Sequence, residues 1–126
     1  MSPHTPARFV AVLLLTAFVA PGEAAERTAT ARVVADRGCT VCHREAPDAR
    51  AAGDAPPLAP TWLEIATRYR ADAAAQARLV RVVLKGADPG PPHWKGRLEF
   101  NSMGGNAPSM TAAQARDVVR WILSTR

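Results

Sequence analysis

Two cysteines and a histidine are the residues whose types and spacing most clearly imply chemistry. The segment at positions 38–43 reads GCTVCH, so Cys39 and Cys42 stand three positions apart and His43 follows at once. Two thiols at this spacing can each add to a vinyl group of a haem, and the adjacent imidazole can bind its iron. The pattern therefore predicts one covalently attached haem c, with His43 as an axial ligand of the iron.

Three other interpretations use the same cysteines. A redox-active pair of the thioredoxin type needs a βαβ pattern around it, and the sequence has no convincing strands. A zinc ion needs about four ligands, and only His43 and the distant His93 accompany the two thiols. A disulfide is common in exported proteins but does not require the histidine. Haem attachment is preferred because it uses all three residues of the motif.

The start of the chain has the composition of a secretory signal peptide. Arg8 precedes a short apolar run over 9–20, and small residues follow, with the best cleavage site after Ala24. The run is shorter than the about 20 apolar residues that span a bilayer. The sequence thus predicts a signal peptide over 1–24, one domain over 25–126 and a periplasmic location. No stable membrane insertion is expected after cleavage, and an uncleaved anchor is the alternative.

The overall charge of the chain is positive. Sixteen lysines and arginines oppose 11 aspartates and glutamates, which gives a net charge of +5. A positive surface favours redox partners with acidic docking surfaces and speeds their encounter at low salt. Nucleic acid is not expected as a partner, because export separates the protein from it and no basic block with interleaved aromatic residues is present.

Hydrophobic periodicity predicts four helices that are separated by loops rich in proline and glycine. The expected helices are Thr28–Arg37, Thr61–Tyr69, Ala73–Lys85 and Ala112–Ser124. Gly38 and Gly86 are expected to end the first and third helices. Thr61 and Glu64 form a capping box, and Thr111 caps the last helix. Without strand signals, the fold class is all-α, with about four helices packed around one covalently bound haem.

The motif and the segments around it resemble the class I cytochromes c, most closely the short bacterial cytochromes c-551 and c-552. Besides the motif, the similar segments are Pro60–Tyr69, Lys85-Gly86, Trp94 and Trp121–Ser124, in the family's order. The resemblance covers residues 32–126. It implies a protein that is not an enzyme and that carries single electrons between respiratory or dehydrogenase partners.

In that family the second axial ligand is a methionine on the loop before the final helix. Met103 lies eight residues before the Thr111 cap, a usual spacing in the family. Met110 directly precedes Thr111, where an apolar residue normally packs at the helix start. Met103 is therefore the preferred ligand and Met110 the alternative, while His93 leaves a bis-histidine haem open. Ligation by His and Met raises the reduction potential of the iron and fills both of its axial sites.

The resemblance also implies roles for three further residues. The Pro60 carbonyl is expected to accept a hydrogen bond from the His43 ring and so to orient it, unless Pro60 only stiffens a helix start. Trp94 is expected to bind a haem propionate through its indole N–H, or simply to pack. Asn106 matches an asparagine that lies near the methionine sulfur in the short family members.

Two departures from the family pattern leave other functions open. Gly104 and Gly105 replace the proline that usually follows the ligand methionine, which predicts a more mobile loop and a weaker iron–sulfur bond. A labile or open sixth site would suit a haem sensor. The loop Glu45–Ala59 is longer than in compact members and has no assigned role. It would be a contact surface if the chain is a dedicated subunit of an exported oxidoreductase complex, and not a monomeric shuttle.

Overall fold

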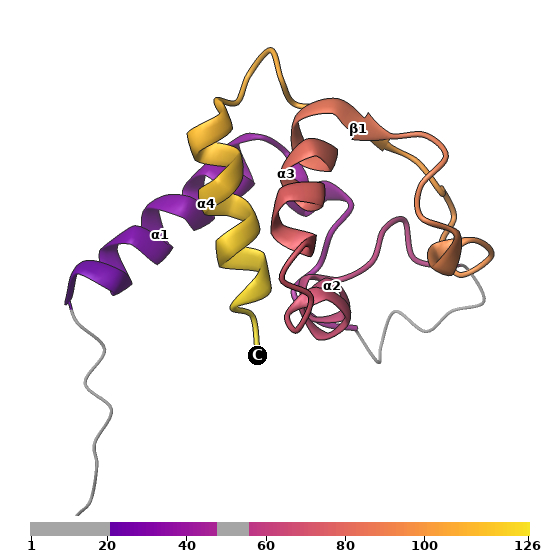
Figure 1. Cartoon of the computed structure of the whole chain (residues 1–126), viewed down its shortest axis with the longest axis horizontal. Coiled ribbons are helices and arrows are strands. Elements are labelled where there is room, and N and C mark those ends of the chain that lie inside the picture. Colours follow the sequence, from indigo (N-terminus) through magenta and orange to yellow (C-terminus); the bar gives the residue numbers. More distant parts are fainter. Residues whose placement is uncertain (1–20, 48–55) are drawn as a thin grey trace, which may run out of the picture.

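Four helices form the frame of the protein, and a long loop segment completes it (Figure 1). The computed structural model describes residues 21–47 and 56–126. The elements are α1 (Pro21–Asp36), the 3-10 turn η1 (Cys39–Val41), α2 (Trp62–Tyr69), α3 (Ala75–Lys85), β1 (Gly86–Ala87), the 3-10 turn η2 (Pro92–Trp94), β2 (Met103–Gly104) and α4 (Ala112–Leu123). The predicted all-α fold is confirmed, although β1 and β2 add a two-residue antiparallel ladder that the sequence did not indicate.

Some of the predictions from the sequence concern residues that the structure does not describe. Residues 1–20 of the predicted signal peptide and residues 48–55 of the predicted Glu45–Ala59 loop lie outside the described residues. Within the described ranges, no helix has the length and apolar character needed to cross a membrane.

Helix α1 begins at Pro21, seven residues before the predicted start at Thr28. Its first two turns are exposed and rich in alanine and glutamate, which are strong helix formers. Proline suits a first helical turn, since the missing N–H has no partner there in any case. Glu26 also pairs with Arg120 of α4, with 3.3 Å between Oε1 and Nη1. Apolar periodicity could not indicate this part of the helix because it buries no apolar face.

Helix α4 is the centre of the packing, since it contacts α1, α2 and α3. Its buried side chains follow helical spacing and are Ala115, Val118, Val119 and Ile122. Val34 of α1 is 1% exposed and belongs to the same cluster. The predicted cap at Thr111 is confirmed, and Gln114 completes a capping box there.

The two short helices α2 and α3 begin and end close to the predicted positions. The capping box of Thr61 and Glu64 is present at the start of α2. Helix α3 begins at Ala75, two residues later than predicted, because the Asp72 carboxylate accepts the Ala74 N–H at 2.9 Å and holds a turn there. Gly86 ends α3 with a φ of 79°, a conformation that favours glycine.

Candidate haem site

The cysteine motif lies on a tight turn that leaves the end of α1. Gly38 has a φ of 71° and reverses the chain after the helix, as predicted from its place in the sequence. The turn η1 follows, and the His43 N–H donates to the Cys39 carbonyl at 3.0 Å. This compact turn directs both thiols and the imidazole toward one cavity of about 450 Å³.

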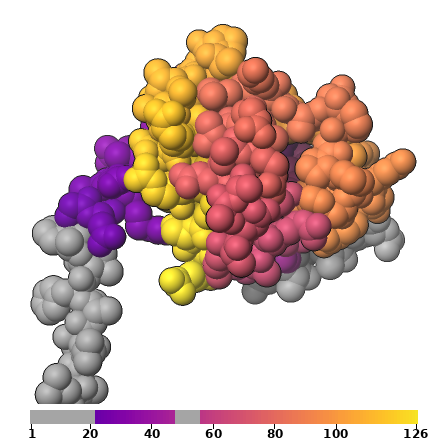
Figure 2. All heavy atoms as spheres, viewed as in Figure 1, coloured from indigo at the N-terminus to yellow at the C-terminus, as the bar shows by residue number. Residues whose placement is uncertain are grey.

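The cavity lies between the motif, the helices α2, α3 and α4, and the loop segment 87–106. Figure 2 shows the molecule hollowed between α3 and the orange part of the chain that follows it. Most of the lining is apolar, and its large apolar side chains include Leu58, Trp62, Ile65, Leu79, Trp94, Leu98, Phe100, Met103 and Ile122. A mostly apolar cavity with a few polar groups is the usual environment of a cofactor.

His43 is oriented by two contacts. Its Nδ1 lies 2.7 Å from the Pro60 carbonyl oxygen, which is the hydrogen bond expected from the sequence. Because a carbonyl only accepts, Nδ1 carries the hydrogen, and the neutral ring keeps its Nε2 lone pair for a metal. Burial lowers the pKa of His43, and the bond to Pro60 opposes this shift. The ring also stacks on Trp62, with centroids 4.4 Å apart, a contact that the sequence did not predict.

Both cysteines of the motif are free thiols. Burial raises the pKa of the half-buried Cys39 above its ordinary value, so its thiol is protonated at neutral pH. Within residues 21–47 and 56–126, no group of three or more His, Cys, Asp and Glu side chains is placed to hold a metal ion. The described elements also contain no βαβ unit around the pair.

The two candidate methionines occupy different environments. Met103, in β2, is half-buried and lines the cavity. Met110 is 4% exposed and packs in the helical core, as expected for an apolar residue before Thr111. The structure thus brings Met103, and not Met110, to the cavity that His43 lines.

The loop that carries Met103 is fastened to the end of α3. The backbone N–H and the Nδ2 of Asn106 both donate to the Val83 carbonyl, at 3.0 and 3.1 Å. The Ala107 N–H donates to the Leu84 carbonyl at 2.8 Å. These carbonyls belong to the last turn of the helix, where no helical partner remains for them. The loop therefore caps α3, and the helix in turn holds the loop.

The glycines of this loop differ in their surroundings. A Cβ on Gly105 would lie 2.6 Å from the Lys85 carbonyl carbon, whereas one on Gly104 would meet nothing within 4 Å. A Cβ on Gly86, across the ladder, would lie 2.3 Å from the Met103 oxygen. The lack of a side chain at Gly105 therefore permits close packing against the end of α3, while the mobility expected from the glycine pair stays a prediction.

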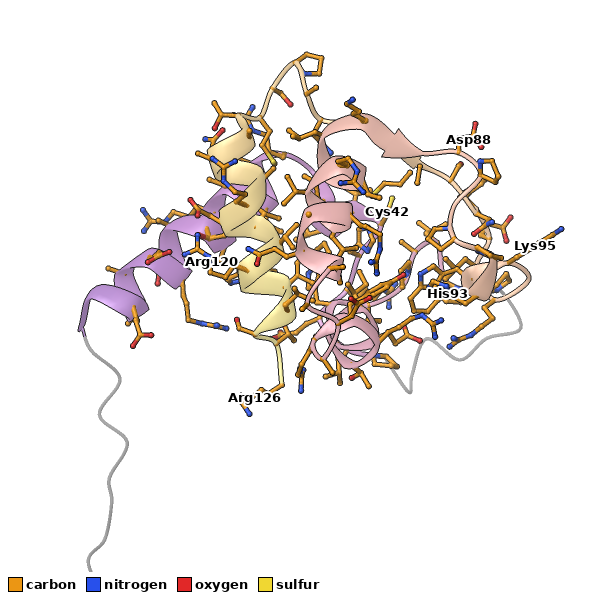
Figure 3. All side chains as sticks on the ribbon, viewed as in Figure 1. Cys42, Asp88, His93, Lys95, Arg120 and Arg126 are labelled. Carbon is orange, nitrogen blue, oxygen red and sulfur yellow. The ribbon has the colours of Figure 1, made fainter. Side chains whose placement is uncertain are left out.

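Trp94 and His93 are neighbours in η2, but only Trp94 lines the cavity. Trp94 is 6% exposed and lines the cavity, and the Arg97 guanidinium lies 5.2 Å from its ring centroid. His93 lines a separate outer groove, where its Nε2 is 2.9 Å from the Tyr69 hydroxyl. Figure 3 shows His93 apart from Cys42. The structure therefore does not bring His93 to the cavity with the motif.

The donor set of the cavity fits a haem c. Two free thiols, a neutral imidazole and a thioether, from Cys39, Cys42, His43 and Met103, line a single apolar space. The sequence profile of the cytochrome c family matches residues 28–126. The chain belongs to the cytochrome c family. It accordingly binds one covalent haem c and is a mono-haem electron carrier.

Known relatives agree with this assignment. Cytochrome c-551 of Allochromatium vinosum is 38% identical over 86 residues, which are 68% of this chain and 74% of the relative. Cytochrome c552 of Nitrosomonas europaea matches with a TM-score of 0.58 and 20% identity, over 76% of this chain and 99% of that one. Class 1 cytochrome MtoD of Sideroxydans lithotrophicus matches with a TM-score of 0.56 and 20% identity, over 78% and 94%. The two structures show the shared fold, and the predicted class I cytochrome c is confirmed.

Proposed function

We propose that this cytochrome c is a periplasmic electron carrier whose haem iron is held between His43 and Met103. One observation carries the proposal: both thiols of the motif, His43 and Met103 line the same apolar cavity. When bound there, the haem supplies an iron that gains and loses one electron, with a potential set by its axial ligands and surroundings. The protein holds both ligands in place, so that no bond to a substrate is made.

His43 is proposed as the proximal ligand. Its Nδ1–H donates to the Pro60 carbonyl, which fixes the tautomer and raises the basicity of the ring. Stacking on Trp62 holds the ring plane. Cys39 and Cys42 are proposed as the points of covalent attachment, because they directly precede this imidazole on the same turn and line the same cavity.

Met103 is proposed as the distal ligand because of the way its loop is held. The ladder of β1 and β2 and the two hydrogen bonds of Asn106 fasten the loop to α3. Asn106 also lines the cavity, and the second hydrogen of its side-chain amide is proposed to donate to the sulfur of Met103. Trp94 is proposed to donate its indole N–H to a haem propionate, since it is buried and lines the cavity.

Spectra of the holoprotein test the ligand assignment. We expect Met103→Ala to lose the weak methionine-to-iron charge-transfer band of the ferric state, and Met110→Ala to keep it. The reverse result would assign the distal ligand to Met110. Survival of the band in both variants would contradict methionine ligation altogether.

Carbon monoxide distinguishes a carrier from a haem sensor. An anchored loop supports a closed sixth site, so the reduced holoprotein should show no fast spectral change with the gas at neutral pH. A fast change would mean that the distal ligand is labile or absent and would favour a sensor.

The proposed location and assembly have tests of their own. Holoprotein recovered from a periplasmic fraction should begin at Ala25 and elute as a monomer. An intact N-terminus would favour an uncleaved anchor, and co-purification with an oxidoreductase would favour a dedicated cytochrome subunit.

A further inference from the structure

A groove of about 910 Å³ lies between the outer side of α2 and the segment formed by η2 and the residues after it. The groove is separate from the haem cavity and is lined largely by charged and aromatic side chains, among them Arg68, Tyr69, His93, Trp94 and Arg97. Figure 3 shows His93 on this side of the molecule. The groove is large enough to take several side chains of another protein.

The groove and the haem cavity share one wall. Tyr69, Pro91 and Trp94 line both spaces. Tyr69 and His93 are joined by a hydrogen bond, and the rings of His93 and Trp94 lie 4.9 Å apart, so the wall is an aromatic layer one side chain thick. A group bound in the groove is therefore close to the cavity without entering it.

Two arginines border this shared wall. The Arg68 guanidinium lies 6.0 Å from the centroid of the Tyr69 ring, and Arg97 lies 5.2 Å from that of Trp94. Burial lowers the pKa of His93, and the charges of these two arginines lower it further. The imidazole is thus neutral at pH 7, and the positive charge at the wall comes from the arginines.

The two carboxylates of the groove are each paired with an arginine. Glu64 pairs with Arg97 at 3.2 Å, and Asp72 pairs with Arg78 at 2.5 Å. The pair of Asp72 and Arg78 is exposed, and surface pairs of this kind contribute little free energy. Both carboxylates stay in the groove, and Glu64 is also held in the capping box of Thr61. The arginines Arg68, Arg78 and Arg97 still exceed them by one positive charge, and Arg68 takes part in neither pair.

We propose that this groove is the docking site for an acidic segment of a redox partner, and that one electron crosses the wall of Tyr69 and Trp94. The inference rests on the proposed function and names the surface through which it operates. The partner loses or gains one electron, the haem in the cavity undergoes the opposite change, and no bond or proton is transferred. Complementary charge orients the encounter more than it strengthens the complex.

Small redox reagents of opposite charge test the route. The reduced holoprotein is oxidised by ferricyanide, an anion, and by tris(phenanthroline)cobalt(III), a cation, in stopped-flow experiments. For Arg68→Gln combined with Arg97→Gln, the ferricyanide rate should fall about 3- to 10-fold at low salt, since steering depends on local charge. The cobalt rate should not fall, and the effect should vanish near 1 M salt, where charges are screened within about 3 Å.

Matched variants separate the groove from the rest of the surface. Arg32→Gln combined with Arg116→Gln removes two exposed charges from α1 and α4 and should change the ferricyanide rate less than twofold. Arg37→Gln removes a charge beside the cysteine motif. An equal loss of rate in the Arg32 and Arg116 double variant would mean that only the net charge matters. A larger loss for Arg37→Gln than for the Arg68 and Arg97 double variant would place the electron exchange at the cysteine motif. Either result overturns the proposal.

Binding itself is tested on the unaltered holoprotein, so that no variant needs to fold. Hexaglutamate is added at low salt, and NMR signals of the protein are followed. Shifts of the Trp94 indole and of the His93 and Arg68 signals are expected. Shifts confined to the neighbourhood of Val41 and Cys42, or none at all, would overturn the docking site. If the proposed axial ligands are wrong, the haem spectrum of the protein alone will show it. The two proposals can therefore fail separately.

Discussion

The helical frame and the loop segment 86–109 are held together by different means. In the frame, α4 packs on three helices through side chains that interlock in a continuous core. In the segment, backbone hydrogen bonds to the last turn of α3 and the close approach of Gly105 hold the chain in position. Many of the side chains of the segment line the haem cavity.

This difference explains how one small chain keeps a stable fold and an open cavity. Burial of apolar side chains stabilises the frame. The segment buries few of its own side chains, so its stability depends on the α3 contacts and on what fills the cavity. The ligand loop is thus positioned by backbone geometry, while its side chains stay available for the haem.

Removal of the covalent haem attachment should cause the largest change in stability and should affect the loop segment more than the helical frame. We expect Cys39→Ala combined with Cys42→Ala to yield a chain without retained haem, whose stability falls by most of the about 5–15 kcal/mol typical of small proteins. Amides of residues 86–109 should exchange faster than those of α4, as measured by hydrogen exchange.

A neighbouring position provides the control for that experiment. Val41 lies in the same motif but is 77% exposed, so Val41→Ser should retain the haem and change stability by less than about 0.5 kcal/mol. Uniform exchange throughout the haem-free chain would show that the frame has no stability of its own.

A core truncation should affect the frame and leave the site unchanged. Met110→Ala removes a buried side chain between the helices and should cost about 2–5 kcal/mol, as measured by urea unfolding of the holoprotein. Met103→Ala removes a half-buried side chain at the cavity and should cost less apart from any bond to iron. An equal loss in the two variants would contradict the division between frame and segment.

Substitutions of the adjacent glycines Gly104 and Gly105 test whether close packing against α3 holds the loop. Gly105→Ala places a Cβ against the backbone of Lys85 and should cost about 1–3 kcal/mol, with a weaker methionine-to-iron band. Gly104→Ala meets open space and should stay within about 0.5 kcal/mol of the parent protein. Equal effects in unfolding and in the ferric spectrum would show that the loop is not held by this contact.

The frame was predictable from the sequence because each of its signals is local. The apolar spacing of α4, the capping box of Thr61 and Glu64, and the glycine after α1 each act within one or two helical turns. The motif was predictable for the same reason, since haem attachment needs only Cys39, Cys42 and His43 on one short turn of the chain. The exposed first turns of α1 escaped detection because they lack an apolar face.

The arrangement of the site was less predictable because its contacts join distant parts of the chain. The family resemblance implied the bond between His43 and Pro60, but nothing local indicated that His43 would stack on Trp62. The glycine pair suggested mobility, although Gly105 is packed against α3. Only the folded structure shows that Trp94 faces both the cavity and the outer groove.

The smallest expected effect concerns His93, which lies where α2 of the frame meets η2 of the segment. Burial, and then the charges of Arg68 and Arg97, lower its pKa in the folded protein, so the unfolded chain binds the proton more readily. The free energy of unfolding should therefore decrease as the pH falls through the ordinary histidine value of about 6.5, and level off below the lowered native pKa. Between pH 7.5 and pH 5, the free energy of unfolding in urea should decrease more for the parent protein than for His93→Gln. An identical decrease would mean that protonation of His93 does not affect the stability of this junction.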